Sequence, residues 1–167
     1  MNKRTIVLDN IRINRIIQRF AHQLIEDFYN EKSLVIIGIS GRGKILAERI
    51  SEELSKCSSI KVQTGHITIN KENPYEKEPS LSFDEKSLHN KVVILIDDVL
   101  NSGRTLMHSL CHIMKSQVKQ VATIVLVDRI HRQFPVKADY VGLTLSTNLK
   151  EHVSVEFNKN NDMAYLS

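Results

Sequence analysis

The stretch VVILIDDVLNSGRTL, residues 92–106, decides the fold. It begins as an apolar run of strand-forming residues, places Asp97 and Asp98 side by side, and then turns through Asn-Ser-Gly. Two adjacent anions at the end of a buried strand repel each other and resist the loss of water. We therefore expect a ligand beyond the end of this strand that requires both carboxylates.

Strands of this kind alternate with helices along the chain. Asp9 can cap a helix that runs to about Asn30, since the apolar residues between them recur at helical spacing. Further strands are predicted at residues 33–39, 59–69, 121–127, 139–145 and 152–157, and further helices at 45–56 and 103–116. This order indicates an α/β fold, with a mainly parallel central sheet and helices on both faces. In such folds, ligands bind outside the carboxyl ends of the strands.

Length and composition limit the number of domains and the classes of ligand. The 167 residues suit one domain, residues 1–167, with a substantial core. The net charge of +4 fits an anionic ligand or a nucleic acid but requires neither. Cys57 and Cys111 form no Cys-x-x-Cys motif, and no stretch approaches a membrane span. We expect a cytoplasmic protein without a targeting signal.

Residues 70–91 form the longest segment without a clear period. The segment is polar and holds two of the three prolines. A loop of this length inside a compact domain is usually functional or disordered. We predict that it is a flexible flap over the site.

Two short loops are predicted to face the same cleft. Residues 40–44, SGRGK, and residues 101–105, NSGRT, each follow a strand and open a helix. Free backbone N–H groups at a helix start bind anions such as phosphate, and Arg42 and Lys44 add positive charge. The two acids between these loops suit sugar hydroxyls or a magnesium ion. A phosphorylated ribose that carries a diphosphate fits all three features.

The same residues resemble a known family. VILIDDVLNSGRT is similar to the signature of the type I phosphoribosyltransferases, which use 5-phosphoribosyl 1-diphosphate (PRPP). The segments LDNIRINRIIQRFAHQLIE, VIIGISGRGKILAERI and LVDRIHRQFPVKADYVG resemble the pyrimidine-operon attenuator/uracil phosphoribosyltransferase family. This resemblance implies the type I phosphoribosyltransferase fold with a small hood, transfer of phosphoribose to a nucleobase, most readily uracil, and a homodimer or higher homo-oligomer.

The resemblance also implies roles for individual residues. Asp97, Asp98 and Arg42 would be catalytic, with the two acids on the ribose hydroxyls. Tyr140 and Val141 would line the base site, with the Tyr140 ring stacked on the base. Mg²⁺ would bridge the ribose and the diphosphate near the two acids, held by ligand oxygens and water rather than directly by the protein. The other residues expected to bind PRPP are those of the two loops: Ser40, Gly41, Gly43, Asn101, Ser102, Gly103, Arg104 and Thr105.

The sequence departs from the family pattern at several places. The flap lacks the expected Tyr-Arg-Asp-Asp run, and Lys71 is a candidate to replace its arginine. Leu143 stands where the family has a lysine, and Asn158 where it has an acid. Catalytic efficiency and base choice therefore stay open.

Two other functions remain as alternatives. The first is a purine phosphoribosyltransferase, which Asp128 disfavours, because a lysine that reads the purine oxo group is expected there. The second is an RNA-binding regulator of pyrimidine genes, which would bind mRNA either in addition to the uracil phosphoribosyltransferase activity or with little enzyme activity. Its RNA surface would combine a basic row on the first helix with a second basic segment, and the residues are Arg12, Arg15, Arg19 and His22, then His131, Arg132 and Lys137.

Each of these motifs also has a simpler interpretation. Paired acids after a strand are, in an arbitrary protein, more often a turn or a helix cap. Tyr140 fits an ordinary core position, and a charged stripe is often only a solvated helix face. His108, Cys111 and His112 have a spacing that suits zinc, but we expect Cys111 to be buried and both histidines to point outward. A zinc site is therefore not predicted.

Overall fold

A six-stranded sheet forms the centre of the computed structural model, which describes residues 4–146, 151–159 and 161–167. The strands lie in the order β4-β3-β2-β5-β6-β7. All neighbours are parallel except β3 and β4. The strand bounds are β2 Ser33–Ile39, β3 Lys61–Thr68, β4 Ser80–Leu81, β5 Val92–Leu100, β6 Gln120–Asp128 and β7 Tyr140–Thr144. The predicted mainly parallel sheet is confirmed.

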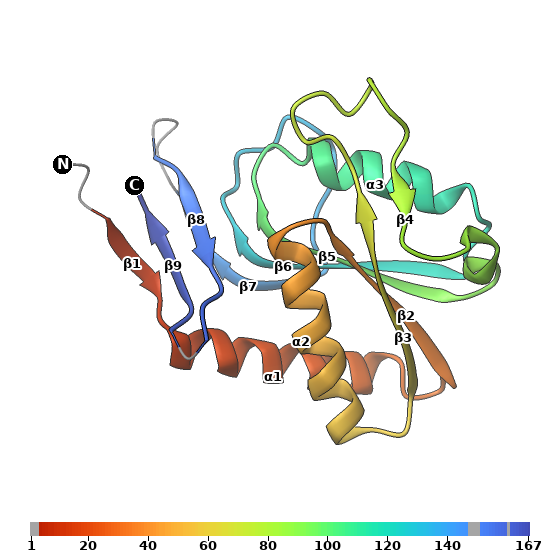
Figure 1. Cartoon of the computed structure of the whole chain (residues 1–167). Coiled ribbons are helices and arrows are strands. Elements are labelled where there is room, and N and C mark those ends of the chain that lie inside the picture. The colour runs from red at the N-terminus through yellow and green to blue at the C-terminus, as the bar shows by residue number, and fades with distance from the viewer. Residues whose placement is uncertain (1–3, 147–150, 160) are drawn as a thin grey trace.

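Helices cover both faces of this sheet (Figure 1). On one face, α1 (Asn10–Asp27) and α2 (Arg42–Cys57) pack into a core with Val92, Ile94 and Ile96 of β5. On the other face, α3 (Arg104–Met114) packs into a second core with Val93 and Leu95. The alternation of side chains along a strand explains why neighbouring residues of β5 enter different cores. The predicted helices on both faces are confirmed.

The first helix begins where its sequence predicts. The side chain of Asp9 accepts a hydrogen bond from the backbone N–H of Arg12 at 2.8 Å, so Asp9 is the N-cap. The apolar residues at helical spacing are buried, and Phe20 and Leu24 have no exposed surface. Burial of such a side chain stabilises the fold by about 1.5–3 kcal/mol relative to leaving it exposed.

A small second sheet forms the hood. It has the order β1-β9-β8, all antiparallel, with β1 Thr5–Leu8, β8 Val153–Glu156 and β9 Met163–Leu166. Figure 1 places it beside the carboxyl ends of the central strands, and its central strand β9 pairs with β1 from the other end of the described chain. The sequence predicted β8. It did not predict β1 and β9, which are strands of only four residues each.

Part of the predicted flap is built into the fold. Within residues 70–91, β4 pairs with β3, and a 3₁₀ turn, η1 (Glu85–Leu88), buries Leu88 completely. Residues 70–79 contain neither a helix nor a strand. The segment that can act as a flap is therefore shorter than predicted and comprises residues 70–79.

None of the helices in the described part of the chain is long and apolar enough to span a bilayer.

Candidate active site

Asp97 and Asp98 lie near the carboxyl end of β5, in the position that the sequence predicts. Their exposed fractions are 6% and 7%, and the Asp98 backbone N–H donates to Asp97 Oδ1 at 2.9 Å. Burial, with the charge of Asp98, raises the pKa of Asp97 to about 8, although Lys71 opposes the shift. Lys71 Nζ lies 3.8 Å from Asp97 Oδ1. Hydrogen bonds from hydroxyl groups, or a nearby cation, would stabilise the charged form of such a pair.

The loop at residues 40–44 brings the start of α2 against these carboxylates. Gly41 has a φ of +95°, which only glycine adopts readily. A Cβ on Gly43 would meet the Ile96 carbonyl oxygen at 2.8 Å and Asp97 Oδ1 at 3.1 Å, so the loop backbone passes directly over the end of β5. Arg42 is exposed on this turn.

Ser40 has a structural contact in the same loop. Its hydroxyl lies 2.9 Å from the Ile67 carbonyl oxygen and 3.0 Å from Thr68 Oγ1. The side chain therefore fixes the loop to the end of β3. Its predicted contact with the substrate stays a prediction.

The loop at residues 101–105 encloses a small hollow. Residues 97–106 line this hollow together with Lys71, and its volume is about 120 Å³. Gly103 has a φ of +85° and is the N-cap of α3. The first N–H groups of a helix have no partner inside the helix, and Arg104, Thr105 and Leu106, which begin α3, line the hollow. The arrangement suits a phosphate group.

Residues 70–79 lie along α3 and reach the same hollow. Arg104 donates through Nη2 to the carbonyl oxygens of Lys71 at 3.0 Å and Glu72 at 3.2 Å. The rings of Tyr75 and His108 lie edge to face, with centroids 4.6 Å apart. These contacts explain how Lys71 comes to lie beside Asp97. They also show that the Arg104 guanidinium is directed to this segment, whereas the sequence predicted a contact with phosphate.

The structure contradicts the predicted stacking role of Tyr140. Tyr140 is the first residue of β7, in register with Ile124 in the middle of β6, and its hydroxyl donates to Asp27 Oδ2 at the end of α1 at 2.6 Å. Its ring packs against the core under α1 and α2. Val141 packs against the core under α3. The carboxyl end of β7 is formed by Leu143 and Thr144 instead.

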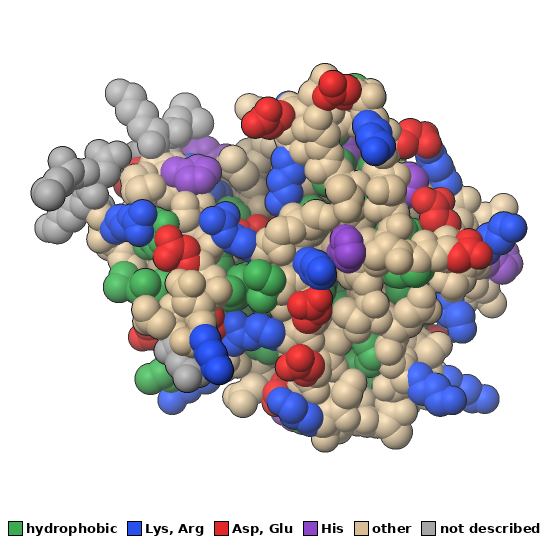
Figure 2. Space-filling model, viewed as in Figure 1, with side chains coloured by type: hydrophobic (Ala, Val, Ile, Leu, Met, Phe, Trp, Pro, Cys, Tyr) green, Lys and Arg blue, Asp and Glu red, His purple; other side chains and the backbone are tan. Residues whose placement is uncertain are grey.

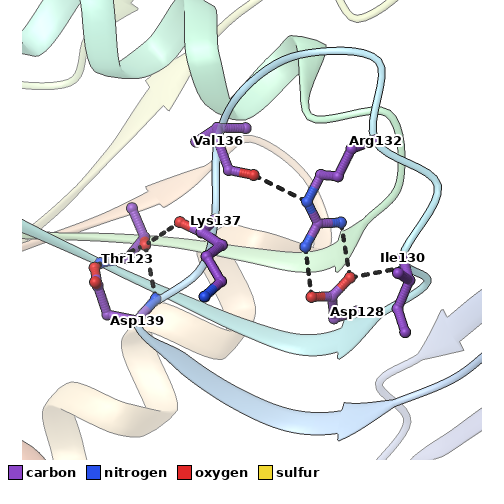
Figure 3. A network of polar contacts seen from close by, with 7 residues as sticks. All are labelled: Thr123, Asp128, Ile130, Arg132, Val136, Lys137 and Asp139. Atoms are coloured by element: carbon purple, nitrogen blue, oxygen red, sulfur yellow. Dashed lines mark hydrogen bonds and ion pairs between the residues drawn. The ribbon is translucent and has the colours of Figure 1, made fainter.

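Asp128 is likewise not free to meet a base. Both of its carboxylate oxygens pair with Arg132, at 2.8 and 2.5 Å (Figure 3). Direct repulsion of a purine oxo group, which the sequence suggested, therefore does not apply. The same pair removes Arg132 from the predicted RNA surface, because Arg132 Nε also donates to the Val136 carbonyl oxygen.

The predicted basic row lies on the exposed face of α1. Arg15 and His22 are exposed, whereas Arg19 donates to the carbonyl oxygens of Val141 and Gly142. The row therefore runs beside β7, an edge strand of the central sheet. Charged side chains of both signs are spread over the face shown in Figure 2, so that view shows no large region of one sign.

The prediction about the histidines of α3 was wrong in part. His112 is buried, and its Nε2 lies 2.7 Å from Glu85 Oε1, whereas Cys111 is exposed. The buried face of α3 therefore differs from the predicted one. It includes His112, because η1 packs against that side of the helix. Among the described residues, no group of three or more His, Cys, Asp or Glu side chains could hold a metal ion.

The comparisons agree with the geometry of these loops. The family model of the phosphoribosyl transferase domain matches residues 3–160, so the chain belongs to the phosphoribosyltransferase family. Within that family, the chain is 36% identical to the bifunctional protein PyrR of Staphylococcus saprophyticus over 157 residues, which cover 90% of each chain. It is 37% identical to the bifunctional protein PyrR of Clostridium novyi over 165 residues, 93% of this chain and 91% of that one. The predicted resemblance is confirmed.

Solved structures support the fold. The hypoxanthine phosphoribosyltransferase of Trypanosoma cruzi superposes with a TM-score of 0.76 over 96% of this chain and 95% of that one, at 16% identity. The hypoxanthine phosphoribosyltransferase of Staphylococcus aureus gives a TM-score of 0.72 over 87% and 80%, at 21% identity. At these identities, the likeness shows the fold and does not identify the base.

Proposed function

We propose that the protein transfers the 5-phosphoribosyl group of PRPP to uracil, which yields UMP and diphosphate. One observation carries the proposal. The buried carboxylates of Asp97 and Asp98 lie between two loops that turn at Gly41 and Gly103, and the second loop encloses a hollow large enough for a phosphate group. The similarity to the bifunctional PyrR proteins supports uracil as the base.

Different residues of the site are proposed to bind different parts of PRPP. Residues 101–105 hold the 5-phosphate at the start of α3. Asp97 and Asp98 accept hydrogen bonds from the ribose hydroxyls. As the bond to diphosphate breaks, the sugar gains positive charge, which nearby carboxylates stabilise. Arg42, exposed at the start of α2, stabilises the leaving diphosphate.

Magnesium fits this site as a companion of the substrate. No cluster among the described residues could hold it alone, but burial and the charge of Asp98 disfavour a charged Asp97 beside the hollow, and a cation there would offset that cost. Asp97 and Asp98 would lie near the ion, and oxygens of PRPP and water would supply most of its ligands. The ion would neutralise charge on the diphosphate.

Residues 70–79 are proposed to form the flap. A closed flap excludes water, which would otherwise hydrolyse PRPP. The contacts of this segment with Arg104 and His108 hold it next to the hollow.

A panel of bases tests the reaction and its specificity. The protein is incubated with PRPP, Mg²⁺ and either uracil, hypoxanthine or guanine, and diphosphate release is measured. We expect uracil to give the fastest release. A faster reaction with a purine would favour the purine phosphoribosyltransferase instead.

Binding of pyrimidine-operon mRNA is the second proposed function. It is supported by the exposed Arg15 and His22 on α1, which lie in a row beside the edge strand β7. Lys137 is exposed on the segment that leads into β7 and is proposed to belong to the same surface. Cationic groups in a row can meet successive phosphates.

A homodimer or higher homo-oligomer is also proposed. Ile6, Ile11 and Ile45 are exposed large apolar residues, at 59%, 61% and 38%. Contact between copies would remove such side chains from water. Sedimentation velocity at micromolar concentration tests the assembly, and a monomer throughout would contradict it.

A further inference from the structure

A loop outside the predicted site supports the phosphate-binding turn. This supporting loop, residues 129–137, connects β6 to β7. The backbone N–H groups of Gln133 and Phe134 both donate to the Ser102 carbonyl oxygen, at 2.9 and 3.0 Å. The backbone N–H of Arg129 donates to the Leu100 carbonyl oxygen at 3.0 Å. The turn at residues 100–102 is thus held from outside its own chain segment.

The supporting loop also packs directly under Gly103. A Cβ on Gly103 would lie 2.6 Å from Val136 Cγ1 and 3.4 Å from the Phe134 carbonyl oxygen. No space separates the two loops at this point. A displacement of Val136 would therefore displace the turn that begins α3.

One ion pair fixes the shape of the supporting loop (Figure 3). Arg132 binds Asp128, the last residue of β6, through two hydrogen bonds of 2.8 and 2.5 Å. Its third donor position, Nε, binds the Val136 carbonyl oxygen at 2.9 Å. One guanidinium group therefore connects the end of the sheet to the residue beneath Gly103.

The Arg132–Asp128 pair is largely buried, as expected of a contact that holds the loop in place. The side chains of Arg132 and Asp128 are 24% and 11% exposed. Burial would raise the pKa of Asp128, but the hydrogen bonds from Arg132 and from the Ile130 backbone hold it below its usual value. Ile130 has a φ of +59°, a strained conformation for a β-branched residue, which the bond from its N–H to Asp128 Oδ1 helps to hold.

The far end of the segment is also anchored. The Thr123 backbone N–H donates to Asp139 Oδ2 at 2.8 Å, and the Asp139 N–H donates back to Thr123 Oγ1 at 3.1 Å (Figure 3). Both ends of the loop are thus fixed to β6, and Arg132 holds Val136 between them.

We infer that Asp128 and Arg132 are positioning residues for the 5-phosphate of PRPP, acting through Val136 and Phe134 on the turn at Ser102 and Gly103. This inference rests on the proposed function, because it assigns that turn to the phosphate. It gives Asp128 and Arg132 a role in PRPP binding without contact with the base or with RNA.

A double-mutant cycle separates positioning from direct contact. Asp128→Asn, Arg132→Lys and the double variant are titrated with PRPP and Mg²⁺ by calorimetry. Each single change should weaken binding roughly ten- to a hundredfold, because a small misplacement of a binding group costs about that much. The double variant should be no worse than the singles, since both act through one contact. Lysine cannot replace the planar fork of arginine at this position.

Steady-state kinetics give the second measurement. The KM for PRPP should rise with the dissociation constant, while the KM for uracil should change less than about twofold. Arg49→Lys is the matched control, since Arg49 forms a similarly half-buried pair with Asp162 that links α2 to the hood. It should lower the melting temperature without raising the KM for PRPP.

A measurement without ligand makes the test independent of the reaction. Amide hydrogen exchange at residues 101–105 should be faster in Asp128→Asn and Arg132→Lys than in the wild type, while exchange at residues 40–43 should not change. Absence of uracil turnover in the wild type would overturn the proposed function but not this prediction. Unchanged exchange at residues 101–105 would overturn the inference.

Direct contact predicts a different pattern. If Arg132 bound the phosphate itself, Asp128→Asn would free its charge and strengthen PRPP binding, and only Arg132→Lys would weaken it. Opposite effects of the two single changes, or additive losses in the double variant, would contradict positioning.

Discussion

At the scale of single residues, the site depends on carboxylates that are costly to bury. Asp97 is 6% exposed, and its neighbours Asp98 and Lys71 act on it in opposite directions. Such an arrangement weakens the free protein and becomes favourable only when the ligand supplies hydroxyl donors or a nearby cation. Stability and function should therefore oppose each other at this residue.

Asp97→Asn should stabilise the free protein while it abolishes turnover. In the unfolded chain, Asp97 titrates near its ordinary pKa of about 3.9, but in the folded protein its pKa is about 8. Between these values the folded state holds a proton that the unfolded state has lost, so stability falls as pH rises through this window and is level above it. The asparagine variant lacks this loss. Its melting temperature should exceed that of the wild type by a few degrees at pH 9 but not at pH 4.

Thermal unfolding without ligand at several pH values checks this prediction. Turnover of Asp97→Asn should fall by about a hundredfold or more, because a charge aimed at the transition state is lost. A difference in melting temperature that does not change with pH would contradict the assigned pKa.

Lys71→Met should weaken PRPP binding and shift the pH profile. Lys71 Nζ lies 3.8 Å from Asp97 Oδ1 and lowers the pKa of Asp97, so the removal of Lys71 lets that pKa rise further. The limb of the pH–rate curve that reports this carboxyl should then move to higher pH. Lys77→Met, an exposed position of the same segment, is the control and should leave the profile unchanged. An unshifted limb in Lys71→Met would contradict the assignment.

At the scale of elements, the start of α3 is proposed to bind the phosphate, and the same helix holds residues 70–79, the proposed flap. Arg104 holds the backbone of residues 71 and 72, and further along the helix Lys115 binds Glu78 at 2.7 Å. The Lys115–Glu78 pair is largely exposed, so it contributes little to stability. The Arg104 contacts to carbonyl oxygens should therefore dominate the position of the flap.

Arg104→Met should loosen residues 70–79 in the free protein. Loss of two hydrogen bonds from a charged donor should speed limited proteolysis within this segment by about tenfold, which corresponds to about 1.4 kcal/mol. Lys115→Ala is the matched variant and should change the cleavage rate by less than about twofold. Equal rates in Arg104→Met and the wild type would show that other contacts hold the segment.

The long elements were predictable from sequence, whereas the short ones were not. The apolar face of α1 and the buried runs of β2, β5 and β6 determine those elements locally. In contrast, β1, β4 and β9 exist because partner strands supply their hydrogen bonds, which no local pattern shows. The prediction that Tyr140 lines the base site failed for a similar reason. The position of Tyr140 depends on where β7 begins along β6, which the local sequence does not show. The Asp128–Arg132 pair has helical spacing but lies outside any helix, so only the structure reveals it.

At the scale of the whole molecule, the proposed transferase site and the basic row on α1 lie on different elements of the structure. The site lies at the carboxyl ends of the central strands, and the row on α1 lies beside the edge strand β7. A change on the row should therefore leave turnover intact, and a change in the site should leave the row intact.

Arg15→Ala tests the proposed RNA surface. Arg15 is exposed, so its removal should reduce the slope of log affinity against log salt by about one without loss of stability. Arg19 is a poorer choice, since it also holds the backbone of β7. Filter binding of structured pyrimidine-operon RNA at several salt concentrations gives the slope. No binding at low salt by the wild type would leave only the enzyme.

The central claim is that the carboxylates of β5 serve phosphoribosyl transfer to uracil. Its most direct test is the initial rate of UMP formation from PRPP and uracil with Mg²⁺, compared between the wild type and Asp98→Asn. The account predicts clear turnover by the wild type and a loss of about a hundredfold or more in the variant, whose circular dichroism should be unchanged. Equal rates in the two proteins, or no UMP from the wild type, would contradict it.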